Sequence, residues 1–585
     1  MTSTTLPDAA DPDIGAAAVA APPARTGGGA GRGRWSGPLL AALVVLAAAL
    51  PGLARLPPLD RDESRFAEAT AQMLETRDFV NTRYLGVPRD KKPVGIHWLQ
   101  AASVALVSPG QVRAIWAYRL PSLLGAMLAA AACCWGAQPF WRRPRALLAG
   151  AILGASFILS SEAFIAKTDA VLCGATTLSM AALARLYGAG RGVGRPKTRY
   201  KALFWIGQGV AMLDKGPIAP MVAALAIAAL WAMDREARWA RRLGWGWGLL
   251  IVLAIVGPWA VAITVATDGR FWSGAVGGDL APKLRGGHES HGAPPGLHLL
   301  LSPLLLFPAT LLLPAALSYG RRAWREPGTR FALAWLVPTW LVFEALPTKL
   351  VHYTLPAYGA LAWLAAAATA QPVGRISRWS GAALSALAGF AYAVVAIIAA
   401  RSYGADGSGT GWAWVAAGLA LAAGLAGALA LTRRAATTGL LAAGGLGVLA
   451  HGALAGGEAP RLARLWTSPR AAALVARARL DPRNGVTPGP LAVAGYAEPS
   501  LVFLLGTDTD LVDGARAADD VADGQPALVE ARQATAFRAE LAHDQTTAVA
   551  AGSVRGYDYS VGKPVELTLW RAQTPPAALQ EPAPP

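Results

Sequence analysis

The chain has 585 residues, of which 54% are hydrophobic and only 15% are charged. A soluble domain carries about 25% charged residues, and many apolar runs here approach the ~20 residues that cross a bilayer, so an ordinary soluble protein is excluded. The net charge of +17 would suggest nucleic-acid binding in a soluble chain. Here, however, Lys and Arg fall in short loops between apolar runs, where they set membrane orientation. We therefore predict a multi-pass membrane protein that binds no nucleic acid.

The N-terminal residues 1–36 are rich in Ala, Gly, Pro and Thr, a composition that does not build a packed core. We predict that they form a disordered cytoplasmic tail. The apolar run 38–56 follows without a convincing small-residue cleavage site, so we expect a retained membrane helix and not a signal peptide. The three cysteines lie in apolar segments, where buried thiols are expected in preference to a disulfide or a metal site.

Residues 37–456 are predicted to form a membrane domain of about thirteen helices, counted by alternating sides at each basic loop. The expected spans are 38–56, 113–136, 146–163, 170–187, 202–214, 216–233, 245–266, 297–317, 331–346, 350–369, 381–400, 412–431 and 437–455. The short basic loops then fall on the cytoplasmic side, as the positive-inside rule requires. The loops 57–112 and 267–296 fall on the other side of the membrane, as does the segment after residue 456.

The external loop 57–112 contains a helical pattern. In "DESRFAEATAQMLE", residues 62–75, the side chains of Phe66, Ala69 and Met73 share one helical face. This pattern predicts an amphipathic helix that lies on the membrane surface.

The C-terminal segment 457–585 changes in character. Strand-like runs occur at 490–496, 501–506, 526–531 and 565–570, between turn and helix signals. Strands that alternate with helical patterns indicate an α/β unit. We predict a small soluble α/β domain on the non-cytoplasmic side.

Polar residues gather at the non-cytoplasmic ends of the predicted helices. The candidate site residues are Asp62, Glu63, Arg65, Lys91, Lys92, Asp169, Lys215, Asp279, Arg285, His288, His291, Lys349, His352 and Tyr353. Ionisable groups at membrane depth are costly and therefore mark functional sites. A one-sided mixture of acids and bases fits catalysis on a substrate with an anionic head and a lipid tail. Cations would hold a phosphate, and a carboxylate would take a proton from an attacking hydroxyl.

Structural explanations exist for several of these residues. Asp60 and Glu63 have the spacing of a capping box, which leaves Asp62 without a structural role. Asp169 could cap its helix, and Lys92 could reach lipid head groups, as could Lys91. Lys215 lies in the short turn of a predicted helical hairpin, where a role in membrane topology explains it as well as a catalytic role. Tyr353 could be an aromatic residue at the membrane interface.

An ordered set of motifs resembles the class C membrane glycosyltransferases (GT-C), in particular the lipid A aminoarabinose transferases and the protein O-mannosyltransferases. The motifs are "DESRFAE" at 62–68, "ML" at 73–74, "KP" at 92–93, "KTDA" at 167–170, "LDKGPIA" at 213–219, "HESHGAPPG" at 288–296, "KLVHYTLPAY" at 349–358 and "EPSLVFLLG" at 498–506. Each motif alone is weak, but the set is specific and spans nearly all of the chain beyond residue 35.

The resemblance implies about thirteen membrane helices, external interfacial helices and a periplasmic C-terminal domain. It also implies transfer of a sugar from a polyprenyl-phosphate donor to a lipid or protein acceptor, with inversion, on the periplasmic face of the bacterial inner membrane. Asp62 takes the position of the catalytic carboxylate, and Asp169 that of the second acid. The predicted ligands of the donor phosphate are Arg65, Lys92, Lys215, Arg285, Lys349 and Tyr353.

The remaining expectations concern the rest of the site. Glu63 is included with the catalytic acids, and the possible acceptor-side residues are Lys91, Asp279, His288, His291 and His352. The family commonly has an acidic residue before its Lys-Pro, where this chain has Lys91, so we predict no metal, with a divalent ion near the two histidines as an open alternative. A transporter or flippase of lipid-linked sugars is the competing function, because it would use the same cations to hold the head group.

Overall fold

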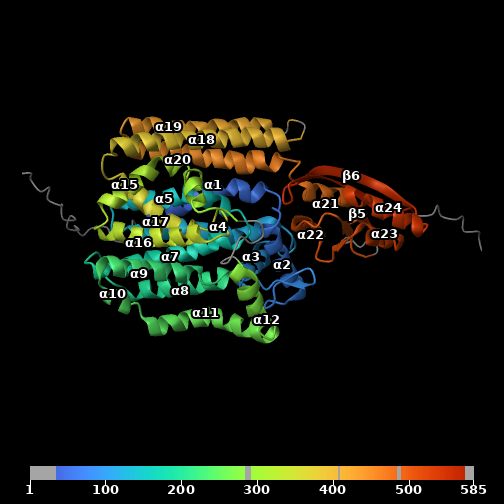
Figure 1. The fold of residues 1–585 in the computed structure, drawn as a ribbon, viewed down its shortest axis with the longest axis horizontal. Coiled ribbons are helices and arrows are strands. Elements are labelled where there is room, and N and C mark those ends of the chain that lie inside the picture. The colour runs from blue at the N-terminus through green and yellow to red at the C-terminus, as the bar shows by residue number, and fades with distance from the viewer. Residues whose placement is uncertain are drawn as a thin grey trace, which may run out of the picture. The chain divides into compact units, whose positions relative to one another are not determined.

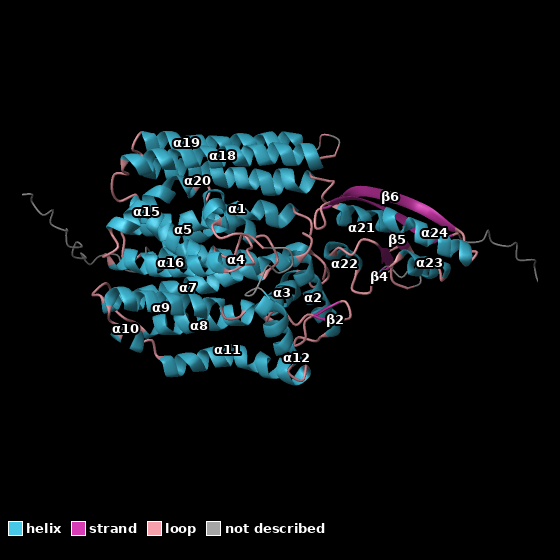
Figure 2. Cartoon of the chain, viewed as in Figure 1, coloured by secondary structure: helices cyan, strands magenta, loops and turns pink. Residues whose placement is uncertain are grey.

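The computed structural model of the chain describes residues 35–282, 292–405, 407, 409–481, 483 and 489–573. Helices dominate it, and the described strands form one short hairpin and one sheet near the C-terminus (Figure 2). The predicted class is confirmed: a helical membrane protein with external loop helices and a small C-terminal α/β domain. The predicted tail, residues 1–36, lies almost entirely outside the described residues.

The helical part extends from α1 to η5 (Figure 1). Its first helices are α1 (Ser36–Arg55), α2 (Asp62–Thr76), α3 (Gly95–Val107), α4 (Ile115–Ala137), α5 (Arg143–Ala155), α6 (Phe157–Glu162), α7 (Thr168–Gly190), α8 (Thr198–Lys215), α9 (Ile218–Asp234), α10 (Arg238–Arg241), α11 (Trp245–Ala266) and α12 (Arg270–Trp272). Its later helices are η1 (Ser273–Leu280), α14 (Leu297–Leu305), η2 (Ala309–Leu312), α15 (Leu313–Arg322), α16 (Pro327–Ala345), η3 (Leu355–Ala357), α17 (Tyr358–Ala368), α18 (Arg375–Tyr403), α19 (Thr410–Thr432), α20 (Ala436–Gly452), η4 (Ala453–Glu458) and η5 (Ala459–Arg461).

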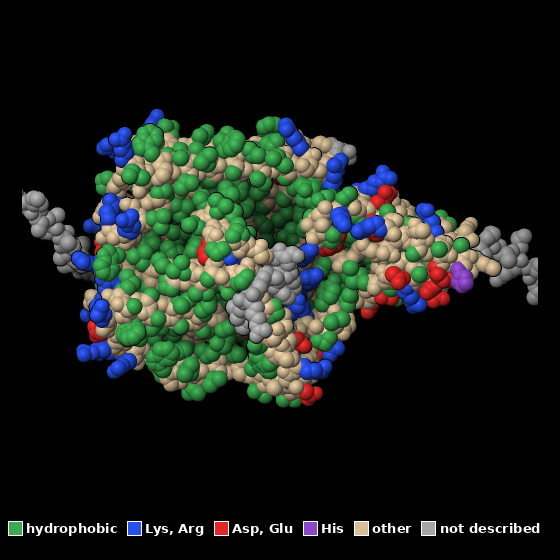
Figure 3. Space-filling view, in the orientation of Figure 1, with side chains coloured by type: hydrophobic (Ala, Val, Ile, Leu, Met, Phe, Trp, Pro, Cys, Tyr) green, Lys and Arg blue, Asp and Glu red, His purple; other side chains and the backbone are tan. Residues whose placement is uncertain are grey.

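In the described part of the chain, 7 helices are long and apolar enough to cross a membrane. They are α1, α4, α7, α11, α18, α19 and the continuous segment Ala436–Arg461. Apolar side chains cover a broad face of this region (Figure 3), and on α11 they include the exposed Leu250, Leu253 and Val261. The chain is a multi-pass membrane protein, whereas the count of about thirteen spans stays a prediction.

Charged residues near the ends of α7, α9 and α16 lie together at one end of the bundle. Asp234 at the end of α9 binds Arg191, which follows α7, at 2.6 Å and also binds Arg330 of α16. The Asp234 carboxylate is fully buried, and the two arginines neutralise its charge. The other end of α7 begins at Thr168, about 35 Å away along a helix of 23 residues.

Three predicted spans differ in detail. The span 146–163 is divided between α5 and α6 at Ser156. The span 297–317 is divided into α14, η2 and α15, where Pro303, Pro308 and Pro314 interrupt regular backbone hydrogen bonding. The span 350–369 begins as a turn, and α17 starts only at Tyr358.

The external loop is more ordered than its sequence pattern predicted. The helix predicted over 62–75 is confirmed as α2, but protein covers more than one of its faces, since Ala67 and Ala71 are as buried as Phe66 and Met73. The hairpin β1 (Arg83–Tyr84) and β2 (Val87–Pro88) follows, and α3 packs on α2. The loop therefore has a fixed conformation at the end of the membrane helices.

The C-terminal part forms a mixed five-stranded sheet of order β4-β3-β5-β7-β6, in which β5-β7 and β7-β6 pair antiparallel. Its elements are α21 (Thr467–Arg477), β3 (Ala492–Ala494), α22 (Pro499–Leu505), β4 (Asp510–Val512), α23 (Gly514–Ala522), β5 (Ala527–Glu530), η7 (Ala531–Gln533), α24 (Ala534–His543), β6 (Ala548–Asp558) and β7 (Lys563–Ala572). Apolar residues on both faces of the sheet are buried by these helices.

One strand prediction in this domain is wrong. The run 501–506 forms most of helix α22 and its C-cap, whereas the runs 490–496 and 526–531 contain β3 and β5, and the run 565–570 lies within β7. A short apolar run does not distinguish a buried strand from a buried helix. Pro499 at the helix start and Gly506 at its end, with φ 128°, decide the conformation.

Candidate active site

A cavity of about 590 Å³ lies where the external loop meets the ends of α7 and α8. It brings together most of the predicted site residues from segments far apart in the sequence. The predicted residues in its lining are Asp62, Arg65, Lys91, Lys92, Asp169, Lys215, Asp279, His352 and Tyr353. Residues that the sequence prediction did not include also line it, among them Asp60, Arg61, Tyr84, Arg89 and Thr348.

Asp62 is the first residue of α2. Burial raises the pKa of its carboxyl, but Lys92, Lys167 and Arg89 outweigh this effect and hold the pKa below the ordinary value of 3.8. Asp62 is therefore an ionised acceptor at neutral pH. The predicted capping box is not formed, because no side chain caps α2 and the Asp60 carboxylate accepts a hydrogen bond from the Ser500 N–H at 3.2 Å instead.

Asp169, near the start of α7, is the centre of an ion-pair cluster. Its carboxylate binds Lys215 of α8, and it lies 3.5 Å from Lys167 Nζ and 3.4 Å from His352 Nε2. Lys167 also pairs with Glu162 at 3.0 Å. Asp169 is therefore paired with several cations at the cavity wall, and its predicted role as the second acid stays a prediction.

Lys92 and Arg89 supply positive charge opposite Asp62. The Lys92 ammonium lies 5.1 Å from the centroid of the Phe66 ring, and the Arg89 guanidinium lies 4.7 Å from it. Burial, followed by repulsion from Lys215, lowers the pKa of Lys92 to about 8. This ammonium gives up its proton far more readily than a solvated lysine.

Arg89 is a functional candidate that the sequence prediction missed. Its Nη1 atom is buried without a hydrogen-bond partner in the described part of the chain, and the residue lines the cavity. A buried guanidinium nitrogen without a partner is costly unless a ligand satisfies it. The sequence feature that could have identified Arg89 is the cation cluster "RDKK" at 89–92, from which the prediction included only the two lysines.

Two predicted residues lie outside the cavity lining. Glu63 is 1% exposed, and its carboxylate pairs with Arg119 of α4 at 2.8 Å. The Lys349 ammonium donates to the carbonyl oxygens of Ala293, at 3.0 Å, and Leu346. Both charged groups have partners inside the protein, and their predicted functional roles stay predictions. Arg285, His288 and His291 lie outside the described residues.

The cavity combines an ionised carboxylate with several cations, some of them already paired. This arrangement can bind an anionic group and accept a proton beside it. Among the described residues, a compact group of potential metal ligands occurs only at Glu540 and His543 of α24 and the adjacent Asp544, which do not line the cavity.

The chain is similar to known glycosyltransferases in sequence and in fold. The family model of dolichyl-phosphate-mannose-protein mannosyltransferase matches residues 91–261. The undecaprenyl phosphate-alpha-4-amino-4-deoxy-L-arabinose arabinosyl transferase of Pseudomonas paraeruginosa is 29% identical over 361 residues, covering 58% of this chain and 64% of the relative. The enzyme of the same name from Aeromonas salmonicida is 29% identical over 341 residues, covering 57% and 59%. The matches therefore span less than two thirds of these relatives' own length.

The fold is similar to that of a solved membrane protein over nearly its whole length. ArnT from Cupriavidus metallidurans, solved bound to undecaprenyl phosphate, superposes with a TM-score of 0.72 at 20% identity, covering 91% of this chain and 97% of that chain. Its apo structure gives a TM-score of 0.70. The chain therefore has the fold of this solved ArnT structure.

Proposed function

We propose that the protein is an integral membrane glycosyltransferase that moves a sugar from a polyprenyl-phosphate donor to a lipid or protein acceptor. The observation that carries the proposal is the convergence of Asp62, Arg65, Lys92 and Lys215 on one cavity beside the membrane helices. The relatives' names specify an undecaprenyl-phosphate-linked aminoarabinose as donor, which supports the same class of donor here.

In the proposed reaction, Arg65, Arg89, Lys92 and Lys215 hold the donor phosphate. The Asp62 carboxylate takes the proton of the acceptor hydroxyl. The acceptor oxygen forms a bond to the anomeric carbon while the bond from that carbon to the phosphate oxygen breaks, and the electron pair leaves with the phosphate. A single direct displacement inverts the anomeric centre.

We propose that transfer occurs on the periplasmic face of the bacterial inner membrane. The cavity adjoins the start of α7, whereas Arg191 lies beyond the other end of this helix in the cluster around Asp234. Arginine-rich loops stay on the cytoplasmic side. Modification of lipid A, or of another envelope component, fits this location.

A transfer assay tests the proposal directly. The purified protein would be reconstituted in liposomes with undecaprenyl-phosphate-linked sugars, and with envelope lipids and proteins from a strain that lacks it. We expect mass spectrometry to find the sugar mass added to an acceptor. Exchange of the donor between leaflets without a new glycosidic bond would instead establish the transporter.

The lowered pKa of Lys92 predicts an alkaline limit to activity. We expect kcat/KM for the donor to fall above about pH 8, because Lys92 then loses the proton with which it binds phosphate. The Lys92→Arg variant is expected to shift this limit upward, since a guanidinium stays protonated. A pH profile of initial rates measures both, and an unchanged limit in the variant would assign it to another group.

The absence of a metal requirement is also proposed. Lys91, Lys92 and Lys215 provide positive charge at the position where the donor phosphate would bind. We therefore expect prior dialysis against a chelator to leave the transfer rate unchanged. Loss of activity that Mg²⁺ or Zn²⁺ restores would refute this proposal and implicate the segment 283–291.

A further inference from the structure

The backbone immediately before Asp62 has an unusual conformation. Arg61 has φ 61° and ψ −108°, whereas side-chain-bearing residues rarely adopt positive φ. Such a conformation persists only where surrounding contacts impose it, and it is concentrated at functional sites. The direction in which α2 starts, and with it the position of Asp62, depends on this residue.

The contacts that impose the conformation come from the C-terminal domain. The Asp60 N–H donates to Tyr559 Oη at 2.6 Å, and the Arg61 guanidinium donates to the Ser560 carbonyl oxygen, both in the turn after β6. The Ser500 N–H of α22 donates to Asp60 Oδ1 at 3.2 Å. Both residues before Asp62 are thus bound by a segment more than 400 positions away.

A buried layer supports this turn from behind. The Ser560 hydroxyl donates to Glu498 Oε2 at 2.9 Å, and the Ser560 N–H donates to Asp558 Oδ1 at 3.0 Å. Glu498 is 7% exposed and Asp558 is 8% exposed. Burial, with repulsion from Asp60 and Asp558, raises the pKa of Glu498 to about 8. This carboxyl is therefore protonated and neutral at neutral pH, so it does not repel the neighbouring carboxylates.

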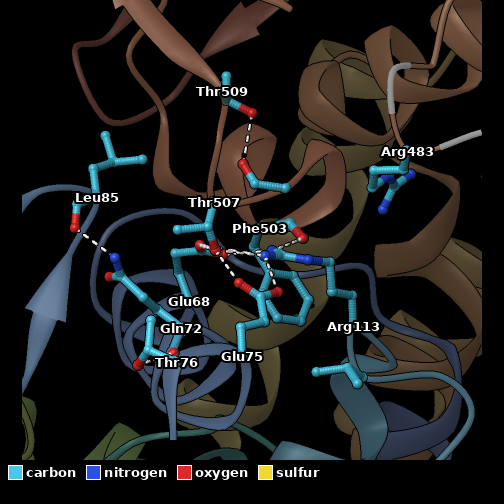
Figure 4. A network of polar contacts seen from close by, with 12 residues as sticks. Glu68, Gln72, Glu75, Thr76, Leu85, Arg113, Arg483, Phe503, Thr507 and Thr509 are labelled. Carbon is cyan, nitrogen blue, oxygen red and sulfur yellow. Dashed lines mark hydrogen bonds and ion pairs between the residues drawn. The ribbon is translucent and has the colours of Figure 1, made fainter. Parts of the chain in front are cut away.

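The domain also holds the second half of α2 (Figure 4). Arg113 donates to Glu68 at 2.6 Å and to Glu75 at 2.8 Å, both on α2, and to the Phe503 carbonyl oxygen of α22 at 2.8 Å. The Thr507 hydroxyl lies within 2.7 Å of both glutamates. The helix that carries Asp62 is therefore fastened to the C-terminal domain at both ends.

The Asp62 carboxylate itself forms no hydrogen bond within the described part of the chain, so its position follows from the backbone of residues 60–62. We propose that the C-terminal domain is a positioning element, in which Tyr559 fixes the strained corner at Arg61 and thereby holds Asp62 toward the donor. This inference rests on the proposed glycosyltransferase function, because it concerns the base of that reaction.

Tyr559→Phe tests the inference in the full-length protein. The variant keeps the ring that contacts Trp466 and removes only the hydroxyl that accepts from the Asp60 N–H. We expect kcat to fall about tenfold with KM for the donor unchanged, because a small displacement of a catalytic group can cost up to about 100-fold in rate. Tyr557→Phe, two residues earlier, is the matched control and should retain wild-type kinetics.

Two further measurements separate positioning from general stability. In an Asp62→Asn background, Tyr559→Phe should not lower the residual rate further, since it acts through Asp62. Hydrogen exchange of the peptide over residues 58–64 should accelerate in Tyr559→Phe and not in Tyr557→Phe. A further loss in the double variant, equal kinetics of the two tyrosine variants, or unchanged exchange would overturn the inference. Absence of transfer in the wild type would instead refute the proposed function.

Discussion

Asp62→Asn is expected to lower the rate of sugar transfer by about 10²- to 10⁴-fold, the usual contribution of a general base. The amide cannot take the acceptor's proton, although it nearly matches the carboxylate in size. Because the positive charges of Lys92 and Arg89 remain, binding of the donor phosphate should persist or strengthen. Single-turnover kinetics and binding of undecaprenyl phosphate measure the two effects separately.

The matched control for this prediction is Asp508→Asn, which makes the same change at an exposed position. It should transfer sugar at the wild-type rate. Both variants should elute as monodisperse species in detergent, so that a lower rate reflects chemistry and not misfolding. Full activity of Asp62→Asn would refute the assignment of Asp62 as the base, whereas absence of transfer in the wild type would refute the proposed function itself.

Glu63→Gln is expected to reduce the stability of the protein by about 3–5 kcal/mol, the usual effect of removing one partner of a buried ion pair. Arg119 is 0% exposed and would keep its charge, with one amide oxygen of the new glutamine and the carbonyl oxygens of Leu53, Leu56 and Pro57 as neutral acceptors in place of a carboxylate. The Glu63 carboxylate also accepts from the Leu59 and Ala166 N–H groups, so it joins three segments. A thermal-shift assay in detergent measures the loss.

Glu566→Gln provides the comparison, since this residue pairs at 3.0 Å with Arg555, whose side chain is 81% exposed. An exposed pair of this kind contributes about 0–1 kcal/mol, so the midpoint should barely change. The fraction of Glu63→Gln that remains folded should transfer sugar normally. A stable but inactive Glu63→Gln protein would support the catalytic role that its motif predicted.

Local sequence patterns were sufficient for the parts of the site that lie on one element or at its end. Asp62 and Arg65 are one helical turn apart on α2, and Asp169 and Lys215 lie at the ends of α7 and α8. The positive-inside rule then placed these helix ends on the same side of the membrane. Their convergence in one cavity follows from hydrophobic periodicity, loop charge and the order of the motifs.

The parts that could not be predicted depend on contacts between distant segments. Glu63 pairs with a residue 56 positions away, so its local spacing suggested a capping box that does not form. The motif around Lys349 suggested a phosphate ligand, but in the structure its ammonium donates a hydrogen bond to the carbonyl oxygen of Ala293. The helix α22 could not be distinguished from a strand because its apolar residues are buried on several sides.

The ion pair between Lys215 and Asp169 would affect how readily the product leaves the cavity in the proposed reaction. A cation that is already neutralised attracts an incoming anion less strongly than a free one, because the existing attraction must first be weakened. In the proposed reaction, this pairing would keep the cavity from holding the polyprenyl-phosphate product too tightly after the sugar has left. As negative charge grows on the departing oxygen, the Lys215 ammonium would pair with that oxygen in place of Asp169. It would pair with Asp169 again when the lipid leaves the cavity. The ion pair that orders the wall of the cavity would thus also limit product inhibition in that reaction.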